Sequence, residues 1–319
     1  MAKLRVAVRK RKRAAFRPST VANHRCMIAK FVRFCVEHKL SHVKPSVDTL
    51  RVYIEHLASK LKADKAVKNY FSAVRLLHKY RDWPTDNLDS FQVELMLRAL
   101  PITMRHVPRK SAQMTPAILR NLCGLAADLG ALGSMLRFAF LISFYGFLRS
   151  SNVCPRTTRS FDPSRHTCRG DVVRRDPGLV IRLKWSKTLQ HAGTHEIPIP
   201  KVTDPLLDPV AAYEAMVAQI PSTPCAPLLL LPGGATVTYS VLTRCLRSMI
   251  RGIGLDPGKY TWHSFRRGGA TASYEAGCDY ISIKRHGTWA SDCFWQYITA
   301  APAAKSQVAA GLARHVVAE

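Results

Sequence analysis

Acidic side chains are scarce in this chain. Its 319 residues include 21 aspartates and glutamates against 48 lysines and arginines, for a formal net charge of +27. The excess is +7 over residues 1–13, +10 over residues 14–110 and +10 over residues 111–319, so it is not confined to a tail. Positive charge on two separate bodies predicts two surfaces for one polyanion. Nucleic acid is the general candidate, and an anionic membrane surface is the weaker alternative.

Long apolar runs and a secretory signal are also missing. No stretch approaches the roughly 18 apolar residues that span a bilayer, and the run at residues 135–148 instead predicts a buried core helix. The first residues lack the apolar segment of a signal peptide. We therefore expect an intracellular protein without a membrane partner.

Cysteine spacing argues against two further classes of protein. The nine cysteines are an odd number without a Cys-x-x-Cys pair, which favours neither a disulfide framework nor a zinc ribbon. The sequence also contains no P-loop, no glycine fingerprint for dinucleotides, no cluster of metal ligands and no internal repeat. We expect reduced thiols, no metal and no cofactor.

Residues 1–19 form a basic arm that contains the run RKRKR from Arg9 to Arg13. Such a run is typical of a nuclear import signal, which would place the protein in the nucleus of a eukaryote. It is also typical of a disordered phosphate-binding arm or of a solvated tail. The sequence leaves these three interpretations open.

Residues 20–104 predict a helical domain, because apolar residues such as Leu50, Ile54 and Leu57 recur at helical spacing. Because this part of the chain is strongly basic, we expect the domain to bind DNA. One predicted helix carries a polar stripe at i, i+4, i+7 and i+11, formed by Lys68, Ser72, Arg75 and Lys79. In a domain with this charge, we predict that Lys68, Arg75 and Lys79 contact phosphate.

Residues 105–114 have no apolar period and predict an interdomain linker. If the domains on both sides bind DNA, the basic residues Arg105, Arg109 and Lys110 are placed to cross a groove of the duplex.

Residues 115–319 predict a second domain that contains both helices and strands. Thr115 has the place of a helix cap, with Pro116 at the first helical position. Leu179, Ile181, Leu183 and Trp185 alternate with Val180, Arg182 and Lys184, which predicts a half-buried strand. His195–Ile199 predicts the strand that returns beside it. Together they predict a hairpin of a small antiparallel sheet, with Lys187 at its tip.

Residues 261–297 hold side chains that suit chemistry on a phosphodiester. His263 and Arg266 share one face of a helix, and they supply a proton carrier and a phosphate-binding cation. Arg267, at i+4, is equally well placed, and Tyr297 is a potential nucleophile. The spacing His-x-x-Arg alone carries no signal, because it occurs four times where composition predicts about 1.1 copies.

Six residues in a fixed order resemble the tyrosine recombinase (phage integrase) family, and more closely its members from eukaryotic mobile elements. They are Arg149 in GFLRSSN, Lys187 in WSKT, His263 and Arg266 in HSFRRGGAT, Trp289 in GTW, and Tyr297 in WQYI. The resemblance covers roughly residues 112–300, and the helical N-terminal half looks like the core-binding domain of that family. It implies a mainly α, two-domain clamp with a mixed α+β catalytic domain.

The resemblance also implies a reaction, site-specific recombination or integration of DNA without metal or ATP. Arg149 and Arg266 would neutralise the phosphate, and Tyr297 would attack it to form a 3′-phosphotyrosyl link. Lys187 would protonate the leaving 5′ oxygen, with support from His263 and Trp289. The family register selects Arg266 over Arg267.

The segment after Tyr297 resembles the terminal helix that family members lend to a neighbouring protomer, which implies a homo-tetramer on double-stranded DNA. The alternative is that its apolar residues Val308, Leu312 and Val316 pack on their own domain.

The sequence departs from the family pattern at two places. Asn152 stands where the family often has an acidic residue, three positions after the first arginine. Trp289 follows Gly287 by two positions, so Thr288 and His286 compete with it for the family's His/Trp position. Tyr274 and Tyr280 are alternatives to Tyr297 as nucleophile. Two alternative functions are a type IB-like topoisomerase and a catalytically inactive DNA-binding or architectural protein.

Overall fold

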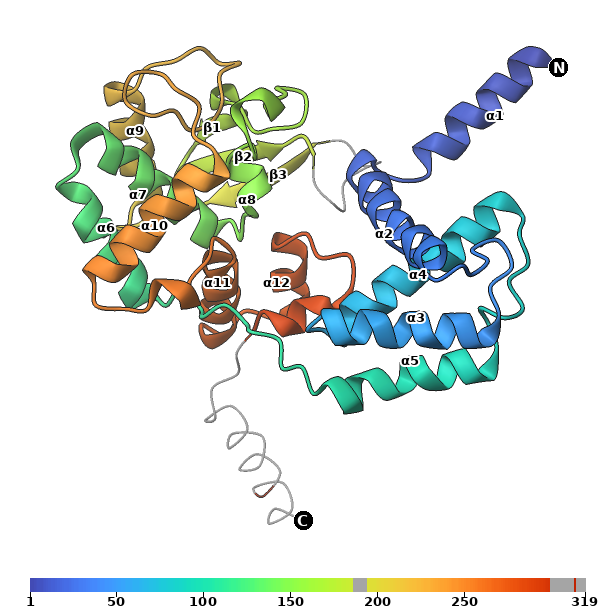
Figure 1. Ribbon diagram of the computed structural model, residues 1–319. Helices are drawn as coiled ribbons and strands as arrows, with labels where there is room; N and C mark the ends of the chain where they lie inside the picture. Colours follow the sequence, from blue (N-terminus) through green and yellow to red (C-terminus); the bar gives the residue numbers. More distant parts are fainter. Residues whose placement is uncertain (186–193, 299–312, 314–319) are drawn as a thin grey trace. The chain divides into compact units, whose positions relative to one another are not determined.

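The computed structural model describes residues 1–185, 194–298 and 313 (Figure 1). The chain divides into two compact units, Met1–Arg109 and Lys110–Glu319, and each has its own hydrophobic core. The division falls within residues 105–115, a stretch that contains neither helix nor strand.

The first unit is built from helices. Helix α2 packs against α4, and α3 packs against α5, around a core that includes Phe31, Tyr53 and Phe71. The start of α3 is fixed by Ser46, whose hydroxyl accepts a hydrogen bond from the Thr49 backbone at 3.1 Å. The helices are α1 (Ala2–Ala14), α2 (Pro18–Glu37), α3 (Val47–Lys60), α4 (Asp64–Arg81) and α5 (Phe91–Met104).

The basic N-terminal arm is helical rather than disordered. Helix α1 consists mostly of Ala, Leu, Lys and Arg, which are strong helix formers. Its apolar residues Leu4 and Val6 are each 64% exposed, so local propensity rather than packing accounts for this helix. Helix α2 already begins at Pro18, inside the segment that the sequence assigned to the arm.

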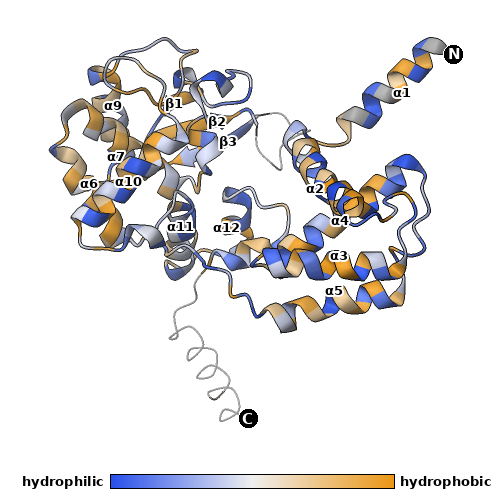
Figure 2. Ribbon diagram, viewed as in Figure 1, coloured by the Kyte–Doolittle hydropathy of each residue, from blue (hydrophilic) through white to orange (hydrophobic). Residues whose placement is uncertain are grey.

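The second unit combines seven described α-helices with a small sheet. Helix α6 begins as the sequence predicts, because the hydroxyl of Thr115 accepts a hydrogen bond from the Ile118 backbone at 3.2 Å. Helix α10 is amphipathic, and Figure 2 shows hydrophilic and hydrophobic residues side by side along it. The helices are α6 (Pro116–Ala127), α7 (Gly130–Tyr145), α8 (Ser150–Val153), α9 (Pro209–Gln219), α10 (Tyr239–Gly252), α11 (His263–Glu275) and α12 (Tyr280–His286). Short 3-10 helices are η1 (Thr158–Ser160), η2 (Arg169–Asp171), η3 (Pro257–Lys259) and η4 (Asp292–Gln296).

The sheet has three antiparallel strands in the order β1-β2-β3. Strand β2 (Gly178–Leu183) pairs with β3 (His195–Ile199), with Ile181 opposite Ile197, which confirms the predicted hairpin. Strand β1 (Val172–Arg175) pairs with the other edge of β2. The sequence did not predict β1, because four residues with only two apolar side chains give too little alternation to detect. The fold class, mainly α with a small antiparallel sheet, is confirmed.

Helix α7 ends earlier than the apolar run at residues 135–148 predicts. The helix stops at Tyr145, and Gly146 occupies its C-cap. Phe147 then adopts φ 47°, a left-handed conformation that is uncommon for a bulky residue and turns the chain out of the helix. This turn places the Phe147 carbonyl and the following Arg149 outside the core that α7 fills.

Helix α11 is held against α7 by aromatic packing and one buried hydrogen bond. Phe265 stacks on Phe140 with ring centroids 5.2 Å apart, and the indole of Trp262 donates to the Ser143 hydroxyl at 3.0 Å. The approach requires glycine, because a Cβ added at Gly269 would lie 2.2 Å from the Phe144 carbonyl oxygen. Gly269 of HSFRRGGAT therefore lets α11 approach the end of α7 closely.

Two features are absent from the described residues. No helix there is both long and apolar enough to cross a membrane. Within the same residues, no group of three or more His, Cys, Asp and Glu side chains is arranged to hold a metal ion.

Candidate active site

Arg266 is a buried cation held in a fixed orientation. Only 2% of the residue is exposed. One terminal nitrogen, Nη1, donates to the Phe147 carbonyl at 2.5 Å, and the other, Nη2, donates to the Gly287 carbonyl at 2.6 Å. These carbonyls belong to the turn after α7 and to the end of α12, which packs against α11 (Figure 1). Arg266 therefore joins three parts of the unit and cannot rotate freely.

Trp289 covers one side of this guanidinium group. The centre of its ring lies 3.8 Å from Arg266 Cζ, a cation–π contact, and the residue is 6% exposed. Its indole nitrogen Nε1 is buried and has no hydrogen-bond partner among the described residues. A donor in this state, next to a fixed cation, is available to an oxygen of a bound anion.

The unusual spacing of GTW follows from the backbone. Thr288 adopts φ 55°, which turns the chain sharply after α12 and folds the Trp289 ring back onto Gly287. A Cβ added at Gly287 would lie 1.7 Å from Trp289 Cζ3, so only glycine fits there. His286, the competing residue, already contacts the Tyr145 carbonyl through Nε2 at 2.7 Å.

Tyr297 directly follows η4 and reaches the start of α11. Its hydroxyl oxygen lies 2.9 Å from His263 Nε2, and its ring centre lies 5.2 Å from that of Trp289. The backbone is fixed as well, because the Thr271 hydroxyl donates to the Tyr297 carbonyl at 3.2 Å. The alternative Tyr280 lies apart, 53% exposed and next to the ring of Trp295, whereas Tyr274 packs against the same hydrophobic cluster as Tyr297.

Arg149 stands at the N-terminal end of α8, beyond the turn made by Phe147. Its backbone N–H donates to Asn152 Oδ1 at 3.1 Å, and Asn152 Nδ2 donates in turn to the Trp185 carbonyl at 3.5 Å. Burial lowers the pKa of Arg149, and the nearby Tyr297 hydroxyl acts in the opposite direction. Arg149 is therefore an electrostatic neighbour of the tyrosine.

The two arginines make this site strongly positive. Burial lowers the pKa of Arg266 to about 9, and repulsion from Arg149 adds to this lowering, while Tyr297 opposes both. Among the described residues, no carboxylate forms a salt bridge with Arg149 or Arg266. Two neighbouring cations without a counter-ion form a site that favours a bound anion.

The same environment keeps His263 neutral. Desolvation of the ring lowers the pKa of His263 below its ordinary value, and the positive charges of Arg266, Arg149 and Arg267 add to the effect. A lowered pKa favours the uncharged imidazole at neutral pH. With its hydrogen on Nδ1, the ring presents Nε2 as an acceptor toward the Tyr297 hydroxyl.

Arg267, the alternative that the sequence could not separate from Arg266, points elsewhere. Its Nη1 donates to the Ser111 carbonyl at 3.0 Å. The structure thus brings together five of the six predicted residues: Arg149, His263, Arg266, Trp289 and Tyr297. The sixth, Lys187, lies outside the described residues, and so does the terminal segment with Val308, Leu312 and Val316.

The predicted DNA-binding residues of the first unit differ in whether their side chains already contact other groups of that unit. Arg75 is held within the unit, because it pairs with Asp89 at 3.0 Å and donates to the Leu88 carbonyl at 2.9 Å. Lys68 lies 3.9 Å from Asp64, whereas Lys79 is exposed. The linker residues Arg105, Arg109 and Lys110 are exposed as well.

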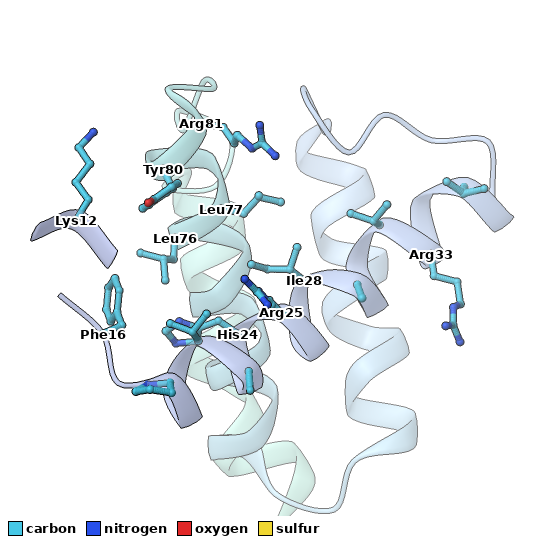
Figure 3. Close-up of a pocket in the computed structure, with 16 residues that line it drawn as sticks. Lys12, Phe16, His24, Arg25, Ile28, Arg33, Leu76, Leu77, Tyr80 and Arg81 are labelled. Atoms are coloured by element: carbon cyan, nitrogen blue, oxygen red, sulfur yellow. The ribbon is translucent and has the colours of Figure 1, made fainter. Parts of the chain in front are cut away.

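The first unit also has a basic groove that sequence reasoning missed. The groove has a volume of about 1220 Å³ and lies between α2 and α4, with Lys12 and Phe16 at one end. Figure 3 shows Ile28, Leu76 and Leu77 between the two helices, with charged side chains around them. Four of the lining residues are cations and none is acidic: Lys12, Arg25, Arg33 and Arg81. Arg25 and Arg33 are eight residues apart on α2, and both line the groove. This pair of basic residues on one helix is visible in the sequence and could have indicated the groove.

Comparison with solved structures identifies this architecture. The chain is similar to the Tn1549 transposon integrase in complex with transposon right end DNA, with a TM-score of 0.60 and 15% identity over 97% of this chain and 98% of that one. It is also similar to a lambda integrase dimer bound to a COC′ core site, with a TM-score of 0.56 and 14% identity over 91% of this chain and 75% of that one. A third match is the XerH site-specific recombinase bound to difH, with a TM-score of 0.56 and 14% identity over 84% of this chain and 71% of that one.

These likenesses establish the fold. The chain has the fold of the tyrosine recombinases and integrases, with a helical unit followed by a unit that combines helices with a small sheet. The resemblance drawn from the six residues is confirmed at this level. The sequence matches no protein-family model, and no curated protein is significantly similar to it.

Proposed function

We propose that this protein is a DNA strand transferase that cleaves and rejoins strands through Tyr297, with site-specific recombination or integration as the outcome. One observation carries the proposal. The Tyr297 hydroxyl lies 2.9 Å from the acceptor nitrogen of a neutral histidine, beside two arginines that no described carboxylate neutralises. A nucleophile, a proton acceptor and an anion site thus meet at one point.

The scissile phosphate would be held by Arg266 and Arg149. A guanidinium group has five N–H donors, and Arg266 uses two of them on the Phe147 and Gly287 carbonyls. Of the three donors that remain, one is within hydrogen-bonding reach of the Tyr297 side chain, and the others are left for phosphate oxygens, in a plane that the surrounding contacts keep fixed. Fixed positive charge next to a phosphate stabilises the additional charge of the transition state, the task that metal ions perform in many other phosphoryl-transfer enzymes.

The reaction would proceed by exchange of one phosphoester for another. The Tyr297 proton passes to His263 Nε2, the Tyr297 oxygen forms a bond to phosphorus, and the bond from phosphorus to the 5′ oxygen breaks. Lys187 then supplies the proton for that leaving oxygen, as the resemblance implies, and Trp289 Nε1 donates to a phosphate oxygen. Because one phosphodiester replaces another, the strand can be rejoined without ATP.

Double-stranded DNA is the proposed partner of both units. The Tn1549 integrase and the lambda integrase were each solved with DNA, which supports the same partner for a chain with their fold. In the first unit, Arg25, Arg33 and Arg81 at the basic groove, together with Lys79, would contact phosphates. A homo-tetramer on DNA, joined through the terminal segment, belongs to the same proposal.

A nicked duplex that releases a short strand on cleavage tests the function. The native protein should form a covalent adduct that survives a denaturing gel, because the released strand can no longer religate. Tyr297→Phe should form none, and Tyr274→Phe is the matched control that keeps activity. Lack of any adduct from the native protein would contradict the proposed chemistry and would favour a protein that only binds DNA.

A further inference from the structure

A hollow on the surface of the second unit lies next to the candidate active site. It has a volume of about 610 Å³ and is lined by residues of α12, by residues of η4 and by Trp289. Trp289 belongs to both places, because it also covers the guanidinium group of Arg266. Trp295 lines the hollow and precedes Tyr297 by two residues, so their Cα atoms lie at most about 7 Å apart. A ligand in this hollow would therefore be a neighbour of the group joined to Tyr297.

Large apolar side chains are exposed in the hollow. Tyr280 and Ile281, at the start of α12, and Trp295, in η4, are each about half exposed. The ring centres of Tyr280 and Trp295 lie 5.7 Å apart, with the two planes tilted by 36°. One exposed apolar residue is ordinary on a protein surface, whereas three that meet in one hollow from two elements are typical of a binding surface.

The ring of Trp295 is supported from the inside of the unit. Its centre lies 4.7 Å from that of Phe294, which is buried. The ring of Phe294 lies in turn 6.1 Å from that of Trp289. A packed series of rings thus extends from the candidate active site to the surface, and it holds an aromatic face in place for a flat ligand.

The charges around the hollow favour an anionic ligand. Lys284 and Arg285 line it together with one carboxylate, that of Asp292, which pairs with Lys284 at 2.7 Å. Arg285 is exposed, and no carboxylate of the described residues forms a salt bridge with it. The hollow therefore combines exposed rings with a cation. An unpaired nucleotide of a DNA strand has the complementary groups, a flat base and a phosphate.

We infer that this hollow is a stacking site for an unpaired nucleobase next to the cleaved bond, with the base against Trp295 and Tyr280 and a phosphate near Arg285. The inference rests on the proposed function, because cleavage at Tyr297 frees a strand end that carries a 5′ hydroxyl. Stacking of the base at that end keeps the hydroxyl close to the phosphotyrosyl link, which it must attack for rejoining. Every base has a flat face, so the site accepts any base.

Binding of a single strand tests the inference without requiring cleavage. The full-length Tyr297→Phe protein is titrated with a short fluorescein-labelled oligothymidylate and with a fully paired duplex. Addition of Trp295→Ala should weaken oligothymidylate binding by about fivefold or more, as expected for the loss of one stacked base. Duplex binding should change by less than about twofold, because paired bases are not available for stacking on the protein. The salt dependence of binding should keep its slope, because no phosphate contact is lost.

Two further variants and a crosslink locate the effect. Tyr239→Ala is the matched control, because this exposed ring belongs to α10 of the same unit and does not line the hollow, and it should weaken neither complex. Tyr280→Ala should repeat the selective loss, and it provides the test if Trp295→Ala unfolds. Irradiation of a bound strand that contains 5-iodouracil should attach the strand to Trp295 or Tyr280.

The outcomes that overturn the inference are distinct. Equal weakening of strand and duplex, or a shallower salt slope, would assign Trp295 to folding or to phosphate binding. Unchanged strand binding in both Trp295→Ala and Tyr280→Ala would overturn it as well. If these two variants instead reduce self-association in analytical ultracentrifugation, the hollow is a protein interface.

Failure of the proposed function has a different signature. A native protein that forms no covalent adduct, but binds single strands through Trp295, would overturn the function and leave the stacking site. An adduct that forms while strand binding is independent of Trp295 and Tyr280 would overturn the stacking site alone.

Discussion

The ring centre of Trp289 lies 3.8 Å from Arg266 Cζ, and this pair forms the base of the candidate active site. The contact fixes the arginine from one side, while the Phe147 and Gly287 carbonyls fix it in its own plane. Tyr297 lies on the same pair, with its ring centre 5.5 Å from Arg266 Cζ. The ring of Trp289 thus contacts both the proposed nucleophile, Tyr297, and the proposed phosphate-binding cation, Arg266.

Trp289→Phe should separate the two roles of this residue. The phenyl ring keeps the packing over Arg266 but removes the unpartnered Nε1 donor. Because a hydrogen bond to a charged group is worth about 1.5–3 kcal/mol, we expect adduct formation to slow by roughly 10- to 100-fold. DNA binding, measured by fluorescence anisotropy, should change little. If Trp289→Phe cleaves at the native rate, Trp289 only packs against Arg266 and its Nε1 donor plays no part in cleavage.

Gly287→Ala should displace Trp289. The added methyl group would occupy the position of the indole ring, 1.7 Å from Cζ3, so ring or backbone must move. Overpacking of this kind costs about 1–3 kcal/mol, and we expect both a lower free energy of unfolding and slower cleavage. Gly124→Ala in α6 is the matched control, because nothing lies within 4 Å of its added Cβ. That change should stabilise the protein by about 0.5–1 kcal/mol. Equal behaviour of the two variants would contradict the close packing of Gly287 and Trp289.

The lowered pKa of His263 sets the direction of a pH profile. The imidazole accepts the Tyr297 proton only when neutral, and its pKa in the folded protein lies below the ordinary 6.5. The rate of adduct formation should therefore fall to half of its plateau value only below pH 6.5. His263→Gln should be slower throughout and should lack this decrease. A half-maximal rate above pH 6.5, or an identical profile in His263→Gln, would speak against this role.

The basic groove should contribute to the salt dependence of DNA binding. When a protein binds one phosphate fewer, the slope of log K against log salt becomes shallower by about 0.9. We expect the double variant Arg25→Ala, Arg33→Ala to bind duplex more weakly and with a shallower slope. Arg75→Ala is the control, because its guanidinium is already paired with Asp89 and the Leu88 carbonyl. It should lower the free energy of unfolding by about 1 kcal/mol and leave the slope unchanged. A shallower salt slope in Arg75→Ala, together with an unchanged slope in the double variant, would contradict the placement of DNA on this groove.

Much of the fold was predictable because its signals are local. The start of α6 at Thr115 and the β2–β3 hairpin follow from a cap residue and from alternation, and both are confirmed. Strand β1 is too short for its pattern to be detected. The end of α7 depends on the left-handed conformation of Phe147, which apolar composition does not predict.

The candidate site was predictable in its residue types but not in its geometry. The family resemblance selected Arg266 over Arg267, and the structure gives the physical reason, because Arg267 points to the Ser111 carbonyl. The position of Trp289 depends on the φ of Thr288, and the engagement of Arg75 depends on Asp89, which is 14 residues away. Contacts of this kind arise from tertiary packing, which periodicity and spacing do not encode.

Tyr297 is tested directly as the nucleophile by finding the residue to which the DNA becomes attached. The trapped adduct should be digested with protease and nuclease, and the modified peptide should be sequenced by mass spectrometry. We expect a nucleotide joined through its 3′ phosphate to Tyr297. Attachment to Tyr274, to Tyr280 or through a 5′ phosphate would contradict it.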